Sequence, residues 1–274
     1  MGKLFLNKIL KVSVLSVFLL ISTFSFCAPK LVTIDGAVTE IVVALGAQDE
    51  IVGRDSTSLF PQSITTLPDV GYLRALSVEG VLSLKPDVIV TTSDAGPPET
   101  LTMLKKMGVN IHVVDNQYSV EGVLLKIEQV ANIIGRQSQG VTLINVIKKN
   151  ISELNVPKQN TSIMLVMGGG DRGFMVGGKH TRADAMIQLA GGFNIMSEID
   201  GYKLITPEAM LAKNPDVILL LRSALSAEQF STNASIKNTN AAKQNKVFDV
   251  TGLNLLTFGP RIDVAIKTLV ELIN

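Results

Sequence analysis

Two side chains with usable chemistry stand at the end of the stretch from Asp69 to Arg74, where one residue separates Tyr72 from Arg74. The chain has only 3 Tyr and no Trp, so a tyrosine in a loop is noteworthy. A guanidinium nearby favours an ionised phenol, which is an anionic oxygen donor, and it can itself pair with a carboxylate. Residue types alone leave two interpretations open: a ligand-facing pair, or a tyrosine packed at a domain edge beside an arginine in a surface ion pair.

Motifs of enzymes are not found in the sequence. Its two histidines form no H-x-x-x-H pair, and no G-x-S-x-G elbow occurs. We expect His112 to be a packed or an edge residue of a strand, and His180 to cap a helix or face solvent. Gly168, Gly170 and Gly173 match G-x-G-x-x-G, but a β-like run follows them instead of a helix, so we expect a hairpin. The sequence therefore gives no support for an enzymatic function.

The composition also argues against nucleic-acid binding and against chemistry based on cysteine. The formal net charge is +1, and a near-neutral chain lacks the clustered basic surface that nucleic-acid binding needs. Cys27 is the only cysteine, so we expect no disulfide, no thiol nucleophile and no thiolate metal site.

An internal repeat contains the Tyr72 stretch. Ser77–Val90 aligns without gaps with Thr206–Leu219, and a Gly-Tyr pair precedes each copy, ending at Tyr72 and Tyr202. Each copy predicts a short helix, a turn and a buried strand, so we expect two matched lobes that face each other across a ligand. The identical pairs are Glu79/Glu208, Leu82/Leu211, Pro86/Pro215, Asp87/Asp216, Val88/Val217 and Ile89/Ile218.

The order of the predicted elements indicates an α/β fold. Strands and helices alternate, which predicts two lobes, each a mainly parallel sheet flanked by helices. Apolar residues at helical spacing predict a long linking helix within 136–157, between an N-terminal lobe at 28–135 and a C-terminal lobe at 158–274. Near the start of the first lobe we expect a turn at Asp35 and a helix capped by Thr39.

The first 27 residues have the pattern of a signal peptide. A basic start precedes an apolar run from Val12 to Phe26, which is short for a bilayer span. We therefore expect secretion, with cleavage after Cys27. A lipid anchor at Cys27 is the less favoured alternative, because the bulky Phe26 precedes it.

Longer runs of residues carry a resemblance to a known family. The chain resembles class III substrate-binding proteins of ABC importers and, among them, the haemin-binding periplasmic proteins of bacterial haem importers. Its specific part runs from Arg54 to Arg74, whereas the alternating framework alone would equally fit binders of cobalamin or of a ferric siderophore. The runs are 35–41, 44–47, 53–58 and 67–74 in the first half, and 181–187 and 190–192 in the second.

This resemblance implies a function and a site. It implies a periplasmic protein, not an enzyme, that captures haem in the cleft between the lobes and delivers it to the permease of an inner-membrane ABC transporter. An outer-membrane haem receptor system would act upstream. The resemblance makes Tyr72 the axial ligand of the haem iron and Arg74 a partner of a haem propionate, while Tyr202 flanks the haem or packs in the core. A periplasmic enzyme acting on a tetrapyrrole or a sugar is the alternative from another class.

Two features of the resemblance concern the second lobe and the permease. Gly169 stands where some relatives have a histidine that serves haem, so we expect five-coordinate iron or a weak sixth partner such as water, with His180 a poor substitute. Glycines there could let the backbone approach the porphyrin closely. Relatives dock on the permease through one glutamate per lobe, which implies Glu79 and Glu208 here. An acid in the first turn also favours a helix through its dipole, and the two roles are compatible.

Overall fold

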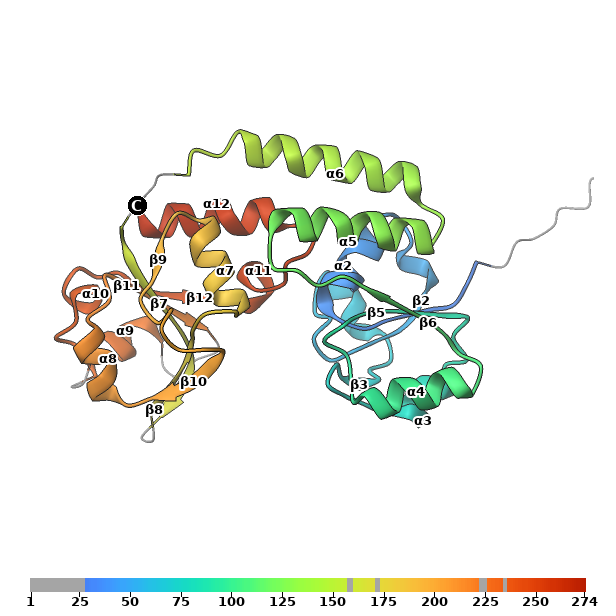
Figure 1. Cartoon of the computed structure of the whole chain (residues 1–274), viewed down its shortest axis with the longest axis horizontal. Coiled ribbons are helices and arrows are strands. Elements are labelled where there is room, and N and C mark those ends of the chain that lie inside the picture. Colours follow the sequence, from blue (N-terminus) through green and yellow to red (C-terminus); the bar gives the residue numbers. More distant parts are fainter. Residues whose placement is uncertain (1–27, 157–159, 171–172, 222–225, 234–235) are drawn as a thin grey trace, which may run out of the picture.

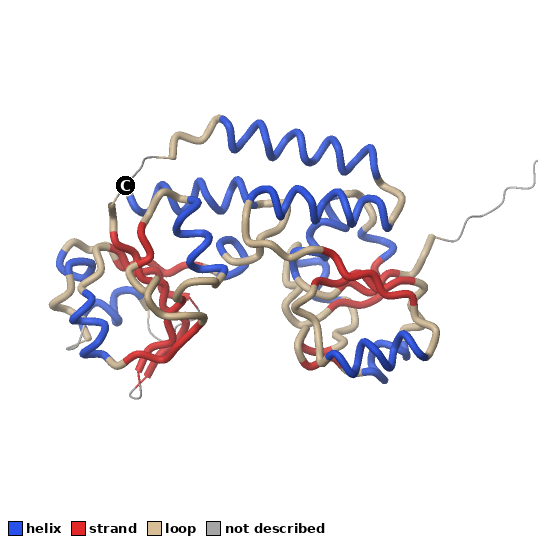
Figure 2. The backbone as a smooth tube through the Cα atoms, in the orientation of Figure 1, coloured by secondary structure: helices blue, strands red, loops and turns tan. Residues whose placement is uncertain are grey.

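The computed structural model describes residues 28–156, 160–170, 173–221, 226–233 and 236–274. The predicted signal peptide, residues 1–27, and the alternative lipid at Cys27 lie outside the described residues. The described chain forms two α/β lobes joined along one side by long helices, and each lobe has its own sheet (Figures 1 and 2). We refer to residues 28–135 as the N-terminal lobe and to residues 158–274 as the C-terminal lobe.

The sheet of the N-terminal lobe has the strand order β2-β1-β5-β6, and all neighbouring strands are parallel. Successive residues of a strand point to opposite faces. Leu31 accordingly packs with α2 and α5 on one face, and Val32 packs with α3 and α4 on the other. The elements are β1 (Leu31–Thr33), α2 (Gly36–Ala44), β2 (Ile51–Arg54), β3 (Gly71–Tyr72), β4 (Ala75–Leu76), α3 (Val78–Ser83), β5 (Val88–Thr92), α4 (Pro98–Lys106), β6 (Asn110–Val114) and α5 (Val120–Ile133), with short 3-10 turns at Gln48–Glu50 and Gln62–Thr66.

Helix α2 begins earlier than the sequence predicted. Asp35 is its N-cap, and the Asp35 carboxylate accepts a hydrogen bond of 2.9 Å from the backbone N–H of Ala37. Thr39 is buried inside the helix, where its hydroxyl donates to Oγ1 of Thr33 at 2.8 Å. The expected cap at Thr39 is therefore wrong, because an aspartate directly after the strand caps equally well and starts the helix sooner.

The sheet of the C-terminal lobe is mainly parallel with an antiparallel edge. Its order is β10-β8-β7-β11-β12, β9 also pairs with β7, and the β7–β8 and β8–β10 pairs are antiparallel. The hairpin predicted from the glycine-rich run is thus confirmed. The elements are β7 (Ser162–Gly170), β8 (Gly173–Gly177), α7 (Arg182–Leu189), β9 (Phe193–Asn194), β10 (Tyr202–Ile205), α8 (Pro207–Lys213), β11 (Val217–Leu221), α9 (Ala227–Thr232), α10 (Asn240–Lys243), β12 (Val247–Val250), α11 (Gly252–Leu255) and α12 (Ile262–Ile273).

The internal repeat has a shared structural basis. Asp87, in the turn before β5, accepts a hydrogen bond of 2.8 Å from the backbone N–H of Lys30 at the entry to β1. Asp216, in the turn before β11, accepts the same kind of bond at 3.1 Å from Ser162 at the start of β7. Each Pro-Asp turn therefore ties its strand to the neighbouring strand of the same sheet, which accounts for the repeated aspartate without any ligand.

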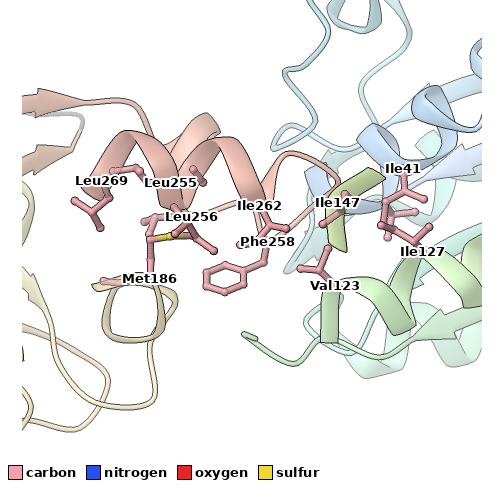
Figure 3. Packing of buried hydrophobic residues seen from close by; sticks show 14 of the residues in the cluster. Ile41, Val123, Ile127, Ile147, Met186, Leu255, Leu256, Phe258, Ile262 and Leu269 are labelled. Carbon is pink, nitrogen blue, oxygen red and sulfur yellow. The ribbon is translucent and has the colours of Figure 1, made fainter. Parts of the chain in front are cut away.

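A common hydrophobic core joins the lobes. Helix α6 (Gln137–Ser152) lies within the predicted linking segment and runs beside α5 and α12 (Figure 1). One cluster of buried side chains extends from Val123 and Ile127 of α5 to Met186 of α7 and Leu269 of α12, with Phe258 between them (Figure 3). The linking helix is thus one part of a continuous packed junction. Of the helices in the described ranges, none is long and apolar enough to cross a bilayer.

Candidate functional site

A cleft of about 450 Å³ lies between the lobes. Its volume falls within the range of about 300–1,000 Å³ that is typical of small-molecule sites. All three tyrosines of the chain line it: Tyr72 and Tyr118 from the N-terminal lobe and Tyr202 from the C-terminal lobe. Three aromatic rings on facing walls suit a ligand with a broad flat surface.

Tyr72 and Arg74 lie on a tight hairpin at the wall of the cleft. Strands β3 and β4 are antiparallel with Tyr72 opposite Ala75, so Leu73 and Arg74 form the turn between them. The backbone N–H of Gly96 donates to the carbonyl of Leu73 at 2.8 Å and holds the turn in place. Tyr72 remains 48% exposed, and the side chain of Arg74 is 63% exposed. A fixed backbone therefore presents two accessible polar side chains to the cleft.

Arg54 and Asp69 support this hairpin. Nη1 of Arg54 lies 3.1 Å from Oδ2 of Asp69, while Oδ1 of Asp69 accepts from the backbone N–H of Gly71 at 2.8 Å. Arg54 is buried, and it also donates to the carbonyl of Thr65 at 3.3 Å. The run from Arg54 to Arg74 thus combines a scaffold at its start with the exposed pair at its end.

Arg182 is the central charge of the cleft. Its Nη2 lies 3.1 Å from Oδ2 of Asp35 and 3.1 Å from Oδ2 of Asp94, so a C-terminal lobe residue binds two carboxylates of the N-terminal lobe. Nη1 donates to the carbonyl of Leu256 at 3.2 Å, and the guanidinium lies over the ring of Tyr118. Burial works to lower the pKa of Arg182, but the charge of Asp35 and further hydrogen bonds raise it. The side chain stays charged and connects the lobes across the cleft.

Arg74 makes weaker contacts within the protein than Arg182 does. Its guanidinium is 4.0 Å from Oδ2 of Asp94, a loose pair for a side chain that is mostly in solvent. The same oxygen of Asp94 already accepts from Asn116 at 2.8 Å and from the hydroxyl of Tyr118 at 3.1 Å. Arg74 is therefore the cleft arginine that is available to an anionic group on a ligand.

Tyr202 lines the opposite wall of the cleft, and its hydroxyl is hydrogen-bonded. Burial raises the pKa of Tyr202, while hydrogen bonds with the Ala183 backbone and the Thr181 side chain act in the other direction. Leu204, in the place that corresponds to Arg74, is an exposed apolar residue without charge. Tyr202 is therefore suited to be a wall of the cleft, and the Gly-Tyr repeat does not extend to the chemistry of Tyr72 and Arg74.

Gly169 and His180 lie in different parts of the C-terminal lobe. Gly169 belongs to β7 and pairs with Phe174 of β8, two residues beyond Met167, which lines the cleft. His180 lines the cleft itself, and its Nδ1 lies 2.9 Å from Oδ1 of Asp200. Thr181, the next residue, is the N-cap of α7, so His180 does not cap this helix. The side chain of His180 faces solvent at the rim of the cleft, which was the other expectation.

Glu79 and Glu208 lie away from the cleft at the starts of two matched helices. Each is exposed in the first turn, of α3 and of α8, after the capping residues Ser77 and Thr206. Both helices lie on the side of the lobes away from α6 (Figure 1). Hydrogen bonds of the Glu208 carboxylate, to its own backbone N–H first and to Thr206 second, lower the pKa of that group.

Four charged or aromatic residues of the cleft had no predicted role at the ligand, namely Asp35, Asp94, Tyr118 and Arg182. One signal was available for the two aspartates. Asp35 follows β1 and Asp94 follows β5, and the carboxyl ends of parallel strands meet at one edge of a sheet, where ligands of α/β proteins bind. Arg182 belongs to the run 181–187 that resembles the family, but it had no predicted role, because its partners Asp35 and Asp94 come from the other lobe.

Two α/β lobes around a ligand-sized cleft define a substrate-binding protein. The chain belongs to the periplasmic binding protein family, which matches residues 31–252, and its fold is that of the class III members.

Three similar proteins illustrate the range of this family. The solved structure of the periplasmic heme-binding protein BhuT in complex with two hemes is 32% identical, with a TM-score of 0.80 over 89% of this chain and 97% of that one. The uncharacterized ABC transporter substrate-binding lipoprotein YvrC of Bacillus subtilis is 25% identical over 88% of this chain and 79% of its own. A vitamin B12-binding protein of Vibrio cholerae is 23% identical over 73% of each chain. The protein is accordingly a substrate-binding protein of an ABC importer and not an enzyme.

Proposed function

We propose that this protein carries haem from the periplasm to the permease of an inner-membrane ABC transporter. The observation that carries the proposal is the exposed Tyr72–Arg74 hairpin turn at the cleft wall. It places a phenol close to a guanidinium that makes only a loose ion pair with Asp94, and both stand on a backbone held by hydrogen bonds. Haem offers a matching pair of groups, a ferric iron and carboxylate side chains.

The chemistry of the two residues suits this ligand. Ferric iron is a hard acid, phenolate is a hard anionic oxygen donor, and tyrosine is an established type of haem ligand. The charges of the iron and of Arg74 both favour the ionised form of Tyr72. Arg74 can then bind a propionate through a charge-assisted hydrogen bond. The rings of Tyr118 and Tyr202 provide apolar surface for the porphyrin on either wall.

Cobalamin is the second candidate, and a specific observation favours it. The relatives include a vitamin B12-binding protein as well as a heme-binding one, so the family alone does not choose between the two ligands. Two features support haem: the 32% identity to the heme-binding protein, and the tyrosine with an arginine two residues later. A ferric siderophore would also use the charge of Arg74, but it brings its own iron ligands and needs no phenolate.

An absorption titration of the purified protein separates these ligands. We expect haemin to bind at a defined stoichiometry, with the charge-transfer band of a tyrosinate complex, and cyanocobalamin not to bind. Haem recovered after incubation should be chemically intact, as it is with a carrier. Binding of cyanocobalamin but not haemin would replace the proposal, and turnover of haem would replace the class of function.

Delivery requires a second surface, for which we propose Glu79 and Glu208. They are exposed, matched by the repeat, and separate from the cleft residues. Basic groups on the permease would recognise one carboxylate from each lobe, so the spacing of the lobes would set the fit. The proposed placement in the periplasm follows from the family and from the signal-peptide pattern at 1–27.

A further inference from the structure

A second groove, with a volume of about 530 Å³, lies between α5 and α6. It shares no residue with the ligand cleft, and α6 lies on the side of the molecule away from α3 and α8 (Figure 1). An apolar surface of this extent on a folded domain usually marks an interaction site. The apolar residues that line the groove are Val120, Leu124, Leu125, Ile144 and Ile151.

The two sides of this groove carry opposite charges. Glu121 and Glu128 line it from α5, Lys148 lines it from α6, and all three residues are exposed. Within the described part of the chain, none of the three forms an ion pair. Lys149, the next residue of α6, does not line the groove and pairs with Glu153 at 3.9 Å. The groove therefore has an apolar floor between one acidic side and one basic side, and it suits a protein surface with the same pattern.

The packing of α5 against α6 places these charges at similar heights along the groove. The helices are antiparallel neighbours (Figure 1), and a Cβ added at Gly140 of α6 would lie only 2.6 Å from the Cβ of Ala131 of α5. Lys148 is eight residues beyond Gly140, so it lies level with the residue eight positions before Ala131. At 1.5 Å per residue, Lys148 is then about 3 Å along the helix axis from Glu121 and about 7 Å from Glu128.

We propose that this groove is the interface of a dimer with a second copy of this chain, in which α5 and α6 of both copies form a four-helix bundle. A twofold axis along the groove places the acidic side of each copy on the basic side of the other. Glu121 of one copy then faces the partner's Lys148, and the same pair forms a second time. Leu125, which is 37% exposed, would be covered together with the other apolar side chains of the groove. An axis across the groove would instead place acid on acid and base on base, which is unfavourable.

This dimer leaves the transport surfaces accessible and does not depend on the haem proposal. The groove and the ligand cleft are lined by different residues, so both clefts of the dimer stay open. Glu79 and Glu208 belong to α3 and α8, on the side away from α6, and remain exposed in both copies (Figure 1).

Sedimentation velocity of the purified protein over a range of concentrations tests the interface. Wild type should show a reversible monomer–dimer equilibrium. Lys148→Glu should weaken dimerisation about tenfold or more, because it places like charges opposite each other twice. Adding Glu121→Lys restores opposite charges, so the double variant should associate like wild type. The matched control is Lys149→Glu, which makes the same change of charge on the neighbouring residue outside the groove and should associate like wild type.

Leu125→Asp gives a second test that does not depend on the charge pairs. It places a carboxylate in the apolar part of the interface, so it should abolish the dimer while haemin binding and thermal stability stay as in wild type. A wild type that remains monomeric at its highest soluble concentration would overturn the proposal and leave the groove to another partner. A dimer that persists in both Lys148→Glu and Leu125→Asp would show that the copies associate through a different surface. Failure of Glu121→Lys to rescue Lys148→Glu would overturn the twofold arrangement. None of these results bears on the haem function, which haemin binding tests separately.

Discussion

The ammonium group of Lys126 lies 3.2 Å from the carbonyl oxygen of Phe258, so a fully buried cation of the N-terminal lobe binds the backbone of the C-terminal lobe. The same Nζ donates to Oδ1 of Asn116 at 2.7 Å. Phe258 in turn packs against the ring of Tyr118, with the ring centroids 5.4 Å apart. This contact is one of several that hold the segment after α11 against the first lobe.

Burial lowers the pKa of Lys126 to about 8, and this gives a prediction for stability. Between pH 8 and the unfolded value of about 10.4, the unfolded chain binds a proton at Lys126 that the folded chain has lost. Stability rises with pH wherever the unfolded state binds more protons. The free energy of unfolding of wild type, minus that of Lys126→Met, should therefore increase by about 3 kcal/mol across this window. Urea unfolding of both proteins at several pH values measures the difference, and parallel curves would show that Lys126 is not buried as described.

Arg182 gives a second prediction about the junction of the lobes. Arg182→Met leaves the carboxylates of Asp35 and Asp94 without their shared cation, and breaking a buried ion pair typically costs about 3–5 kcal/mol. We expect a loss near this size in urea unfolding. The control is Lys267→Met, which removes an exposed pair with Glu271 and should change stability by less than about 1 kcal/mol. Equal effects of the two substitutions would contradict the central role of Arg182.

Local patterns in the sequence predicted most elements of the fold. Apolar periodicity placed the strands and helices within a few residues, and the repeat of Ser77–Val90 at Thr206–Leu219 became α3–β5 and α8–β11. The cap of α2 was misplaced at Thr39, because Asp35 and Thr39 are both good caps and only the packing of Thr39 onto Thr33 decides between them.

The site was less accessible to sequence reasoning than the fold. The Tyr72–Arg74 pair is local, and the structure brings both residues to the cleft. Arg182 gains its importance from Asp35 and Asp94, which are 147 and 88 residues away. His180 likewise depends on Asp200, in another loop. Contacts of this kind are set by how the lobes pack, and no spacing pattern encodes them.

Tyr72→Phe is the sharpest test of the iron ligand. It keeps the ring that lines the cleft and removes only the oxygen, so the fold should be unaffected. Loss of a direct iron ligand should weaken haemin binding by at least about 100-fold, since loss of a group that merely supports a metal ligand already costs about 10–100-fold. The matched control is Tyr202→Phe on the facing wall, which should retain the tyrosinate band and change affinity far less. Unchanged haemin affinity and spectrum of Tyr72→Phe would refute the assignment.

The double substitution Glu79→Ala, Glu208→Ala separates docking from ligand binding. Both carboxylates are exposed, start matched helices and lie outside the cleft, so haemin affinity should equal that of wild type. Transport by the cognate ABC transporter, reconstituted in vesicles, should fall strongly because two contacts with the permease are lost together. Each single substitution should have a smaller effect, since the other lobe still docks. If haemin binding and thermal stability fall along with transport, the two glutamates act through their helices and the docking role is wrong.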